Sequence, residues 1–216
     1  MTVPRSSAAA TLRRIRTARP TVALGERCDM CAEPIAEAHA HVVDLDDRGL
    51  KCTCRACYLL FTDQRASLRY RAVPDRYLWF PDFAFGTADW TDLQIPVGLV
   101  FLFRNSRQDQ MAAFYPSPAG ATESELPLDA WDRIVAANPG LDQLLPDVEA
   151  LLIHRRDSGR GAFACHLVPI DACYQLVGTM RQTWRGFDGG HEAQSAMAAF
   201  FDDVARRSRL VEPWLR

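Results

Sequence analysis

Two CxxC pairs near the N-terminus constrain this chain more than any other feature. Cys28 and Cys31 form the first pair, Cys54 and Cys57 form the second, and 22 residues lie between the pairs. Each tight turn presents two thiolates, so two such pairs are typical of a site that holds one tetrahedral metal ion. We therefore predict a Zn²⁺ site whose ligands are Cys28, Cys31, Cys54 and Cys57.

A fifth cysteine, Cys52, leaves the ligand set open. It can replace Cys54, ligate nothing, or indicate an iron–sulfur cluster. Iron is the alternative metal, although a rubredoxin-like iron site usually has glycine where this chain has Ala32 and Tyr58. Free cysteines packed in a core are a third interpretation. Four cysteine ligands leave no open coordination position, which favours a structural role.

Two histidines lie between the pairs. His39 and His41 are two residues apart, so in a strand both side chains point to the same face. Three interpretations stay open: they are alternate metal ligands, they provide the general base of a His-Asn-His type nuclease, or they form a pair that is exposed or that contacts the metal ligands without binding the ion. That nuclease type also needs a histidine or asparagine on the following helix. Residues 55–69 contain neither, which argues against a nuclease.

The pattern around the cysteines predicts a small zinc-binding fold. Residues 39–45 and 50–53 alternate as two strands of a hairpin would, with a turn at 46–49. From Arg55 the pattern is helical until Pro74 ends it. The residues expected on the apolar face of that helix are Ala56, Leu59, Leu60 and Leu68. A turn, a hairpin and then CxxC at the start of a helix is the order of a treble-clef or zinc-ribbon-like module.

We predict an α+β chain in three parts. Residues 1–24 form a flexible arm, residues 25–72 the Cys-rich zinc-binding module, and residues 73–216 an α+β domain with an antiparallel sheet and C-terminal helices. In that domain we expect strands at 97–105, 110–115, 148–155 and 162–168, a loop at 116–125, a helix at 128–137 and two final helices.

The remaining two cysteines belong to the predicted α+β domain. Cys173 lies on the apolar face of its predicted helix, so we expect it to pack in the core. Cys165 and His166 are adjacent in a predicted strand and point to opposite faces, which argues against a catalytic pair.

The composition of the chain excludes one class of function. The 216 residues include 25 basic and 27 acidic side chains, a formal net charge of −2, which excludes a chain that binds nucleic acid over its whole surface. A treble-clef nucleic-acid-binding protein remains a further alternative because several arginines lie near the module: Arg55, Arg65, Arg69, Arg71 and Arg76.

No run approaches the ~18 apolar residues of a membrane span, and no signal sequence follows the N-terminal arginines. We expect a cytoplasmic protein with reduced cysteines. The GxGxxG, P-loop, GxSxG and HExxH patterns do not occur, which favours a protein that is not an enzyme.

Several stretches resemble an uncharacterised bacterial family that is encoded beside [NiFe]-hydrogenase genes. The stretches are CDMC at 28–31, HAHVVDL at 39–45, CTCRACYLLF at 52–61, IPVGLVFLF at 95–103, FYPSPAGATESEL at 114–126, PDVEALLIHR at 146–155 and PIDACYQLVGTMRQTWRGFDGG at 169–190. The resemblance brings no established activity. It implies a hydrogenase-associated accessory or maturation protein whose partners are hydrogenase subunits or other maturation factors. The contact regions expected for it are the module surface and residues 115–126.

Overall fold

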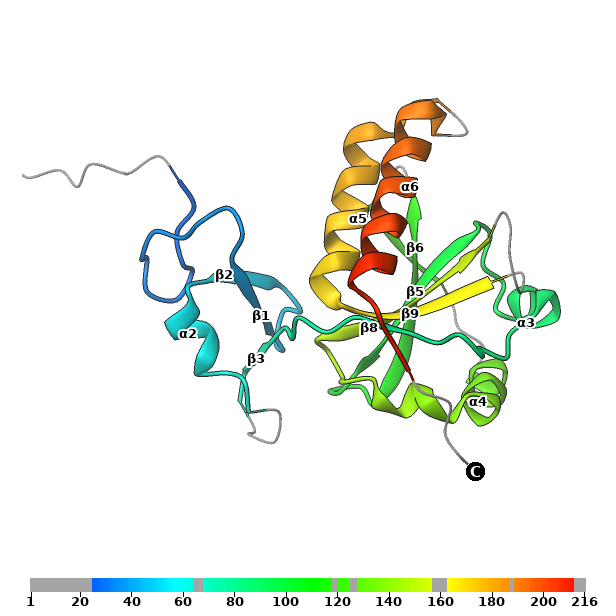
Figure 1. Cartoon of the computed structure of the whole chain (residues 1–216). Helices are drawn as coiled ribbons and strands as arrows, with labels where there is room; N and C mark the ends of the chain where they lie inside the picture. Colours follow the sequence, from blue (N-terminus) through cyan, green and yellow to red (C-terminus); the bar gives the residue numbers. More distant parts are fainter. Residues whose placement is uncertain are drawn as a thin grey trace, which may run out of the picture.

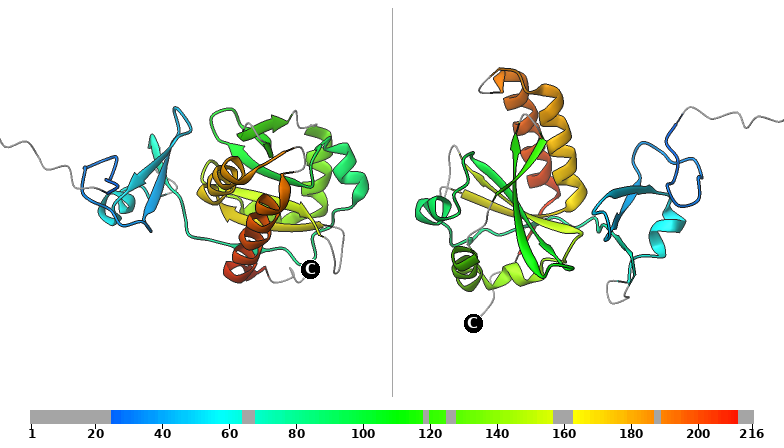
Figure 2. Two further views of the ribbon diagram at one scale, coloured as in Figure 1. Left: turned by 90° about the horizontal axis from the view of Figure 1, so that it is seen from above. Right: turned by 180° about the vertical axis from the view of Figure 1, so that it is seen from behind.

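The computed structural model describes residues 25–63, 68–117, 120–124, 128–156, 163–186 and 189–211. The predicted arm at 1–24 lies outside these residues. The described chain is mixed α+β, as the sequence predicts, and it contains two sheets whose strands are mostly antiparallel (Figure 1, Figure 2).

The smaller sheet lies in the cysteine module, residues 25–72. Its strand order is β2-β1-β3, with β1 at Ala40–Asp44, β2 at Leu50–Thr53 and β3 at Tyr70–Ala72. The predicted hairpin is confirmed, because β1 and β2 pair antiparallel around a short turn. The helix α2 (Arg55–Leu59) follows β2 directly.

The prediction of a helix from Arg55 to Pro74 is right only for its first five residues. The helix ends at Leu59, and Tyr70–Ala72 instead forms β3, which pairs with the free edge of β1. Pairing there gives the backbone groups of β1 partners on both sides. The expected apolar helix face is not buried either: Leu59, Leu60 and Leu68 are 51%, 69% and 40% exposed.

The larger sheet has seven strands in the order β10-β4-β9-β8-β5-β6-β7. All neighbours are antiparallel except β10 and β4, which run parallel. The strands predicted near 97–105, 110–115, 148–155 and 162–168 are confirmed. The strand bounds are β4 Leu78–Trp79, β5 Leu99–Asn105, β6 Gln110–Ser117, β7 Gly120–Ser124, β8 Glu149–Arg155, β9 Phe163–Pro169 and β10 Arg209–Leu210.

The prediction of a loop at 116–125 is wrong. The start of this stretch extends β6, and Gly120–Ser124 forms β7, the edge strand of the larger sheet. Ser117 stands opposite Gly120, and the Thr122 hydroxyl donates a hydrogen bond of 2.9 Å to the Ser117 hydroxyl. Proline and serine made this stretch look irregular. Pro116 nevertheless fits in β6 because it lies beyond the residues of β6 that pair with β5, so one side of its backbone needs no partner.

Helices cover both faces of the larger sheet. On one face lie α5 (Ile170–Thr183) and α6 (Gly190–Arg207), which run side by side in Figure 1. The opposite face packs against three elements: α3 (Thr87–Asp92), α4 (Leu128–Ala137) and the 3₁₀ helix η1 (Pro139–Gln143). The predicted helix at 128–137 and the two final helices are therefore confirmed. None of the described helices combines the length and apolar character that crossing a bilayer requires.

Strand alternation divides the core into two clusters. In β5, Leu99 and Phe101 pack toward α5 and α6, while Val100 and Leu102 pack toward the opposite layer. The first cluster also contains Val43 of β1, so one face of the module sheet shares the core of the larger sheet. The module is packed against the rest of the chain by apolar contact.

Buried ion pairs fasten the segment that follows the module. Glu149 is fully buried, and Arg76 reaches it with two hydrogen bonds, from Nε to Oε1 at 2.8 Å and from Nη2 to Oε2 at 2.6 Å. The backbone N–H of Leu145 donates to the same carboxylate. Nearby, Arg71 of β3 pairs with Asp147 at 3.1 Å. These contacts hold the module and the segment after it against β8.

Replacing Arg76 with methionine should destabilise the fold strongly. The Glu149 carboxylate would stay buried without its cation, which costs about 3 kcal/mol of unfolding free energy. Chemical denaturation measures the change. The matched control is Arg133→Met, whose partner Asp92 is on the surface and whose loss should cost less than ~1 kcal/mol. Equal effects of the two substitutions would contradict the assigned role of Arg76.

His166 is a buried titratable group in β9. Its Nδ1 lies 3.1 Å from the Ser208 hydroxyl, which itself donates to the Val204 carbonyl and so accepts from the ring. Burial lowers the pKa of His166 to about 4, and the nearby charges of His154 and Arg156 act in the same direction. The folded protein therefore disfavours the imidazolium form.

Stability should fall as the pH drops from about 6.5 to 4, because the unfolded chain binds a proton at His166 that the folded chain rejects. The loss attributable to this residue is up to ~3 kcal/mol. His166→Asn keeps a donor for Ser208 and removes the titration, so the variant should show a flatter dependence of unfolding free energy on pH. Parallel pH profiles for the variant and the unaltered protein would contradict this account.

Candidate metal centre

The structure brings together the four cysteines that the sequence singles out. The sulfur atoms of Cys28, Cys31, Cys54 and Cys57 all lie within 4.8 Å of one another, and those of Cys31 and Cys54 are 3.7 Å apart. A tetrahedral ion bound at ~2.3 Å from each sulfur sets its ligands ~3.8 Å apart. The cluster therefore has the dimensions of a four-thiolate metal site.

A tight turn presents the first pair. The N–H of Cys28 donates to the Glu33 carbonyl, and the N–H of Ala32 donates back to the Cys28 carbonyl, both at 2.8 Å. Ala32 has a φ of 62°, the left-handed conformation that lets the chain reverse after Cys31. The guanidinium of Arg27 donates to the Ala32 carbonyl and steadies the turn.

The start of α2 presents the second pair. Cys54 is the N-cap residue, and its sulfur accepts a hydrogen bond from the N–H of Cys57 at 3.5 Å. Cys57 lies one turn further on, and residues three apart share a face of a helix. Both sulfurs therefore point toward the turn of the first pair.

The electrostatics of the cluster call for a cation. Burial raises the pKa of the Cys28 thiol, but backbone N–H groups of Cys54, Cys31 and Met30 outweigh it and bring that pKa to about 6. At Cys57, the hydrogen bond to Cys31 and burial raise the pKa to about 12. The Cys28 thiolate thus forms readily while the Cys57 thiol resists ionisation beside it, and a bound metal ion would stabilise both as thiolates.

The donor set limits which ions fit. Four cysteine sulfurs suit Zn²⁺ or iron and leave no coordination position for a substrate. These residues can therefore hold an ion whose chemistry is to cross-link the turn of Cys28 and Cys31 to the start of α2.

Cys52 is not part of the four-cysteine cluster. Its N–H donates to the Asp29 carboxylate at 2.7 Å, and its carbonyl accepts from the Asp29 N–H at 2.8 Å, so its backbone holds the first turn against β2. Its sulfur instead lies near the two histidines: ligand atoms of His39, His41 and Cys52 are within 4.8 Å of one another. The three residues named as alternate ligands thus form a group of their own.

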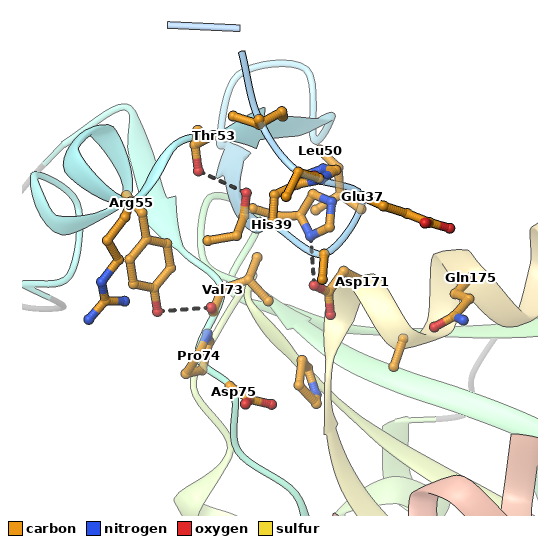
Figure 3. Close-up of a pocket in the computed structure, with 18 of the residues that line it drawn as sticks. Glu37, His39, Leu50, Thr53, Arg55, Val73, Pro74, Asp75, Asp171 and Gln175 are labelled. Carbon is orange, nitrogen blue, oxygen red and sulfur yellow. Dashed lines mark hydrogen bonds and ion pairs between the residues drawn. The ribbon is translucent and has the colours of Figure 1, made fainter. Parts of the chain in front are cut away.

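A pocket of about 1070 Å³ separates the module from α5 (Figure 3). His39 borders it from the module, and Asp171 borders it from the first turn of α5. His41 Nδ1 and Asp171 Oδ2 are 2.8 Å apart, and the Tyr174 hydroxyl donates to the Arg48 carbonyl at 3.0 Å. Polar contacts thus bridge the two sides of the pocket.

Sequence reasoning missed Asp171. It is 130 residues from His41, and an acidic residue in the first turn of a helix is common because it suits the helix dipole. No pattern in the sequence connects it with the histidines, and only the packing of α5 against the module does so.

The other predicted residues lie elsewhere. Cys165 and Cys173 are buried in opposite core clusters, and burial raises the pKa of both thiols, as expected of packed cysteines. Three arginines near the module are paired with carboxylates: Arg69 with Asp44, Arg71 with Asp147 and Arg76 with Glu149. Arg65 lies outside the described residues. These pairs weaken the nucleic-acid alternative, which needs cations available for phosphate.

A family model matches residues 27–208 of this chain, from the turn of the first cysteine pair to the end of α6. Its description is a family of unknown function, DUF5947, and the chain belongs to that family. Comparison with curated proteins found no match, and neither did comparison with solved structures.

Replacing Cys57 with serine should remove one metal ion per chain and loosen the module, because metal binding and folding are coupled in such sites. Native mass spectrometry counts the ions, and limited proteolysis reports whether residues 25–72 become accessible. Cys173→Ser is the matched control, since this thiol is buried in the core away from the cluster and its loss should leave the metal content unchanged. An unaltered metal content in Cys57→Ser would refute the assignment.

Proposed function

We propose that this protein is a non-catalytic, zinc-containing accessory factor that acts by contact with another protein, in the assembly of a [NiFe]-hydrogenase or a related redox enzyme. The observation that carries the proposal is the convergence of four thiols on one point, with a geometry that leaves an ion no free position. Such an ion holds a surface in shape and performs no chemistry of its own.

We further propose that the module is a treble clef. The order of its parts supports this: a turn with two cysteines, the β1–β2 hairpin, and a helix whose first turn carries the second pair. The small size of the sheet supports it as well, because a module of this length buries too little apolar surface to be stable without a cross-link or a neighbouring domain.

Exposed apolar side chains support a role in protein contact. Leu59 and Leu60, at the end of α2, are 51% and 69% exposed, and Leu68 of the same module is 40% exposed. Leu59 and Leu60 are neighbours in the chain, and exposed apolar residues that adjoin mark interaction sites more often than isolated ones do. The edge strand β7 lies within the 115–126 region, and the outer side of an edge strand can pair with a strand of another protein, which makes it a second contact surface.

The identity of the partner rests on the sequence resemblance. The family that the chain resembles is encoded beside [NiFe]-hydrogenase genes, which points to hydrogenase subunits or maturation factors. A visible spectrum of the purified protein separates zinc from the iron alternative, since a four-thiolate iron site is coloured and a zinc site is not.

Affinity purification from the native host tests the proposal. The tagged protein should bring hydrogenase subunits with it, and the double substitution Leu59→Glu and Leu60→Glu should reduce their recovery at least tenfold while metal content stays the same. The matched control is Leu210→Glu, an equally exposed leucine on β10. Normal hydrogenase activity and metal content in a deletion strain would overturn the proposed role.

A further inference from the structure

We propose that His39, His41 and Cys52 form a second metal site, separate from the four-cysteine cluster and open to exchange of its ion. One ring nitrogen of each histidine and the Cys52 sulfur lie within 4.8 Å of one another. Two imidazoles and one thiolate are a ligand set that divalent first-row transition ions such as Zn²⁺ and Co²⁺ accept. The proposal goes beyond the proposed function, since it requires neither a protein partner nor a particular ion at the four cysteines.

The strand register brings the three side chains together. His41 and Cys52 stand directly opposite each other in the β1–β2 ladder, and opposite residues of an antiparallel pair share a face of the sheet. His39 is two residues before His41 and lies on that same face. The two rings meet edge to face with their centroids 4.8 Å apart. His41 and Cys52 are thus held by paired backbone, and His39 lies immediately before the first residue of β1.

The hydrogen bond of His41 prepares its other nitrogen for a metal. Nδ1 lies 2.8 Å from the Asp171 carboxylate, which can only accept, so Nδ1 carries the proton and Nε2 has the lone pair. A carboxylate that accepts from a metal-bound histidine is the usual outer partner of such a ligand, because it fixes the ring orientation and raises its basicity. Asp171 is a positioning residue in this site.

His39 provides an independent observation. Its side chain is only 9% exposed, and its Nδ1 lies 2.9 Å from the Ala36 carbonyl, which again places the proton on Nδ1. The remaining nitrogen, Nε2, is buried and has no hydrogen-bond partner within the part of the chain that the structure describes. Buried polar atoms are rarely left unsatisfied. A metal ion would accept the lone pair that this nitrogen presents.

The surroundings distinguish this site from the four-cysteine cluster. Three protein ligands leave a coordination position for water or another small ligand, as in exchangeable and catalytic zinc sites. Both histidines and Asp171 line the pocket between the module and α5, and the His41 side chain is 24% exposed, so solvent reaches the His41 edge of the group. We infer that this ion binds more weakly and exchanges faster than the ion at the four cysteines.

Titration with Co²⁺ tests the site in the full chain. The starting sample is protein whose metal content, measured after purification, equals one ion per chain. We expect one further equivalent of Co²⁺ to bind and to produce the near-ultraviolet absorption of a thiolate–cobalt bond. Failure to bind a further equivalent, or binding without that absorption, would overturn the proposal.

Substitutions assign the second equivalent to its ligands. The double variant His39→Gln and His41→Gln should lose it, and Cys52→Ser should lose the thiolate–cobalt absorption while keeping the first ion. Asp171→Asn should weaken Co²⁺ binding by about 10- to 100-fold. The retained first ion and an unchanged circular dichroism spectrum show that a variant is folded, and Cys52→Ser and Asp171→Asn keep the test decisive if the double variant does not fold.

Two control variants separate the site from its neighbourhood. Asp75→Asn alters a carboxylate that lines the same pocket and pairs with Arg207, so it should leave Co²⁺ binding unchanged. Cys173→Ser alters a buried thiol in the core and should also bind as before. If Cys52→Ser keeps the thiolate–cobalt absorption, Co²⁺ has entered the four-cysteine cluster and the second site is refuted.

Discussion

The alternation of side chains along β1 is the constraint on which the rest of this structure depends. Successive side chains of a strand point to opposite faces, so His41 and Val43 must share one face of the module sheet, and the His39 ring lies beside His41 just before the strand. Val43 joins the core beneath α5, and His41 meets Asp171 at the start of that helix. A slip of one residue in the register would turn all three away together. Apolar packing, the junction with α5 and the histidine cluster are therefore consequences of a single pairing.

Two groups of candidate metal ligands with different chemistry lie in the module. The four-cysteine cluster is built from the turn of Cys28 and Cys31 and the start of α2, while the histidine cluster is built at the open end of the β1–β2 hairpin. The backbone of Cys52 connects them, since it bonds to Asp29 in the first turn while its sulfur faces His41. A well-ordered four-cysteine cluster should therefore favour a well-ordered histidine cluster.

The elements that sequence periodicity predicted well are those whose pattern reflects local geometry. The hairpin, the helix at 128–137, the strands of the buried sheet and the final helices all have apolar residues at the spacing of their own structure. The failures have a common cause. Tyr70–Ala72 became β3 because β1 had a free edge, and Gly120–Ser124 became β7 because β6 had one. β3 pairs with a strand far along the chain and β7 with the strand directly before it, and in a short, polar segment neither pairing leaves much trace in the sequence.

For the candidate sites, the sequence by itself determined that the two CxxC pairs can share an ion, because a CxxC turn presents two ligands whatever surrounds it, but it left open whether Cys52 replaces Cys54. It also determined that His39 and His41 share a face. Only the tertiary structure decided that Cys52 belongs with those histidines, since strand register depends on pairing, and that Asp171 supports one of them from across the pocket. The physical reason is distance along the chain: local spacing sets which side chains can act together, and long-range packing sets which of them do.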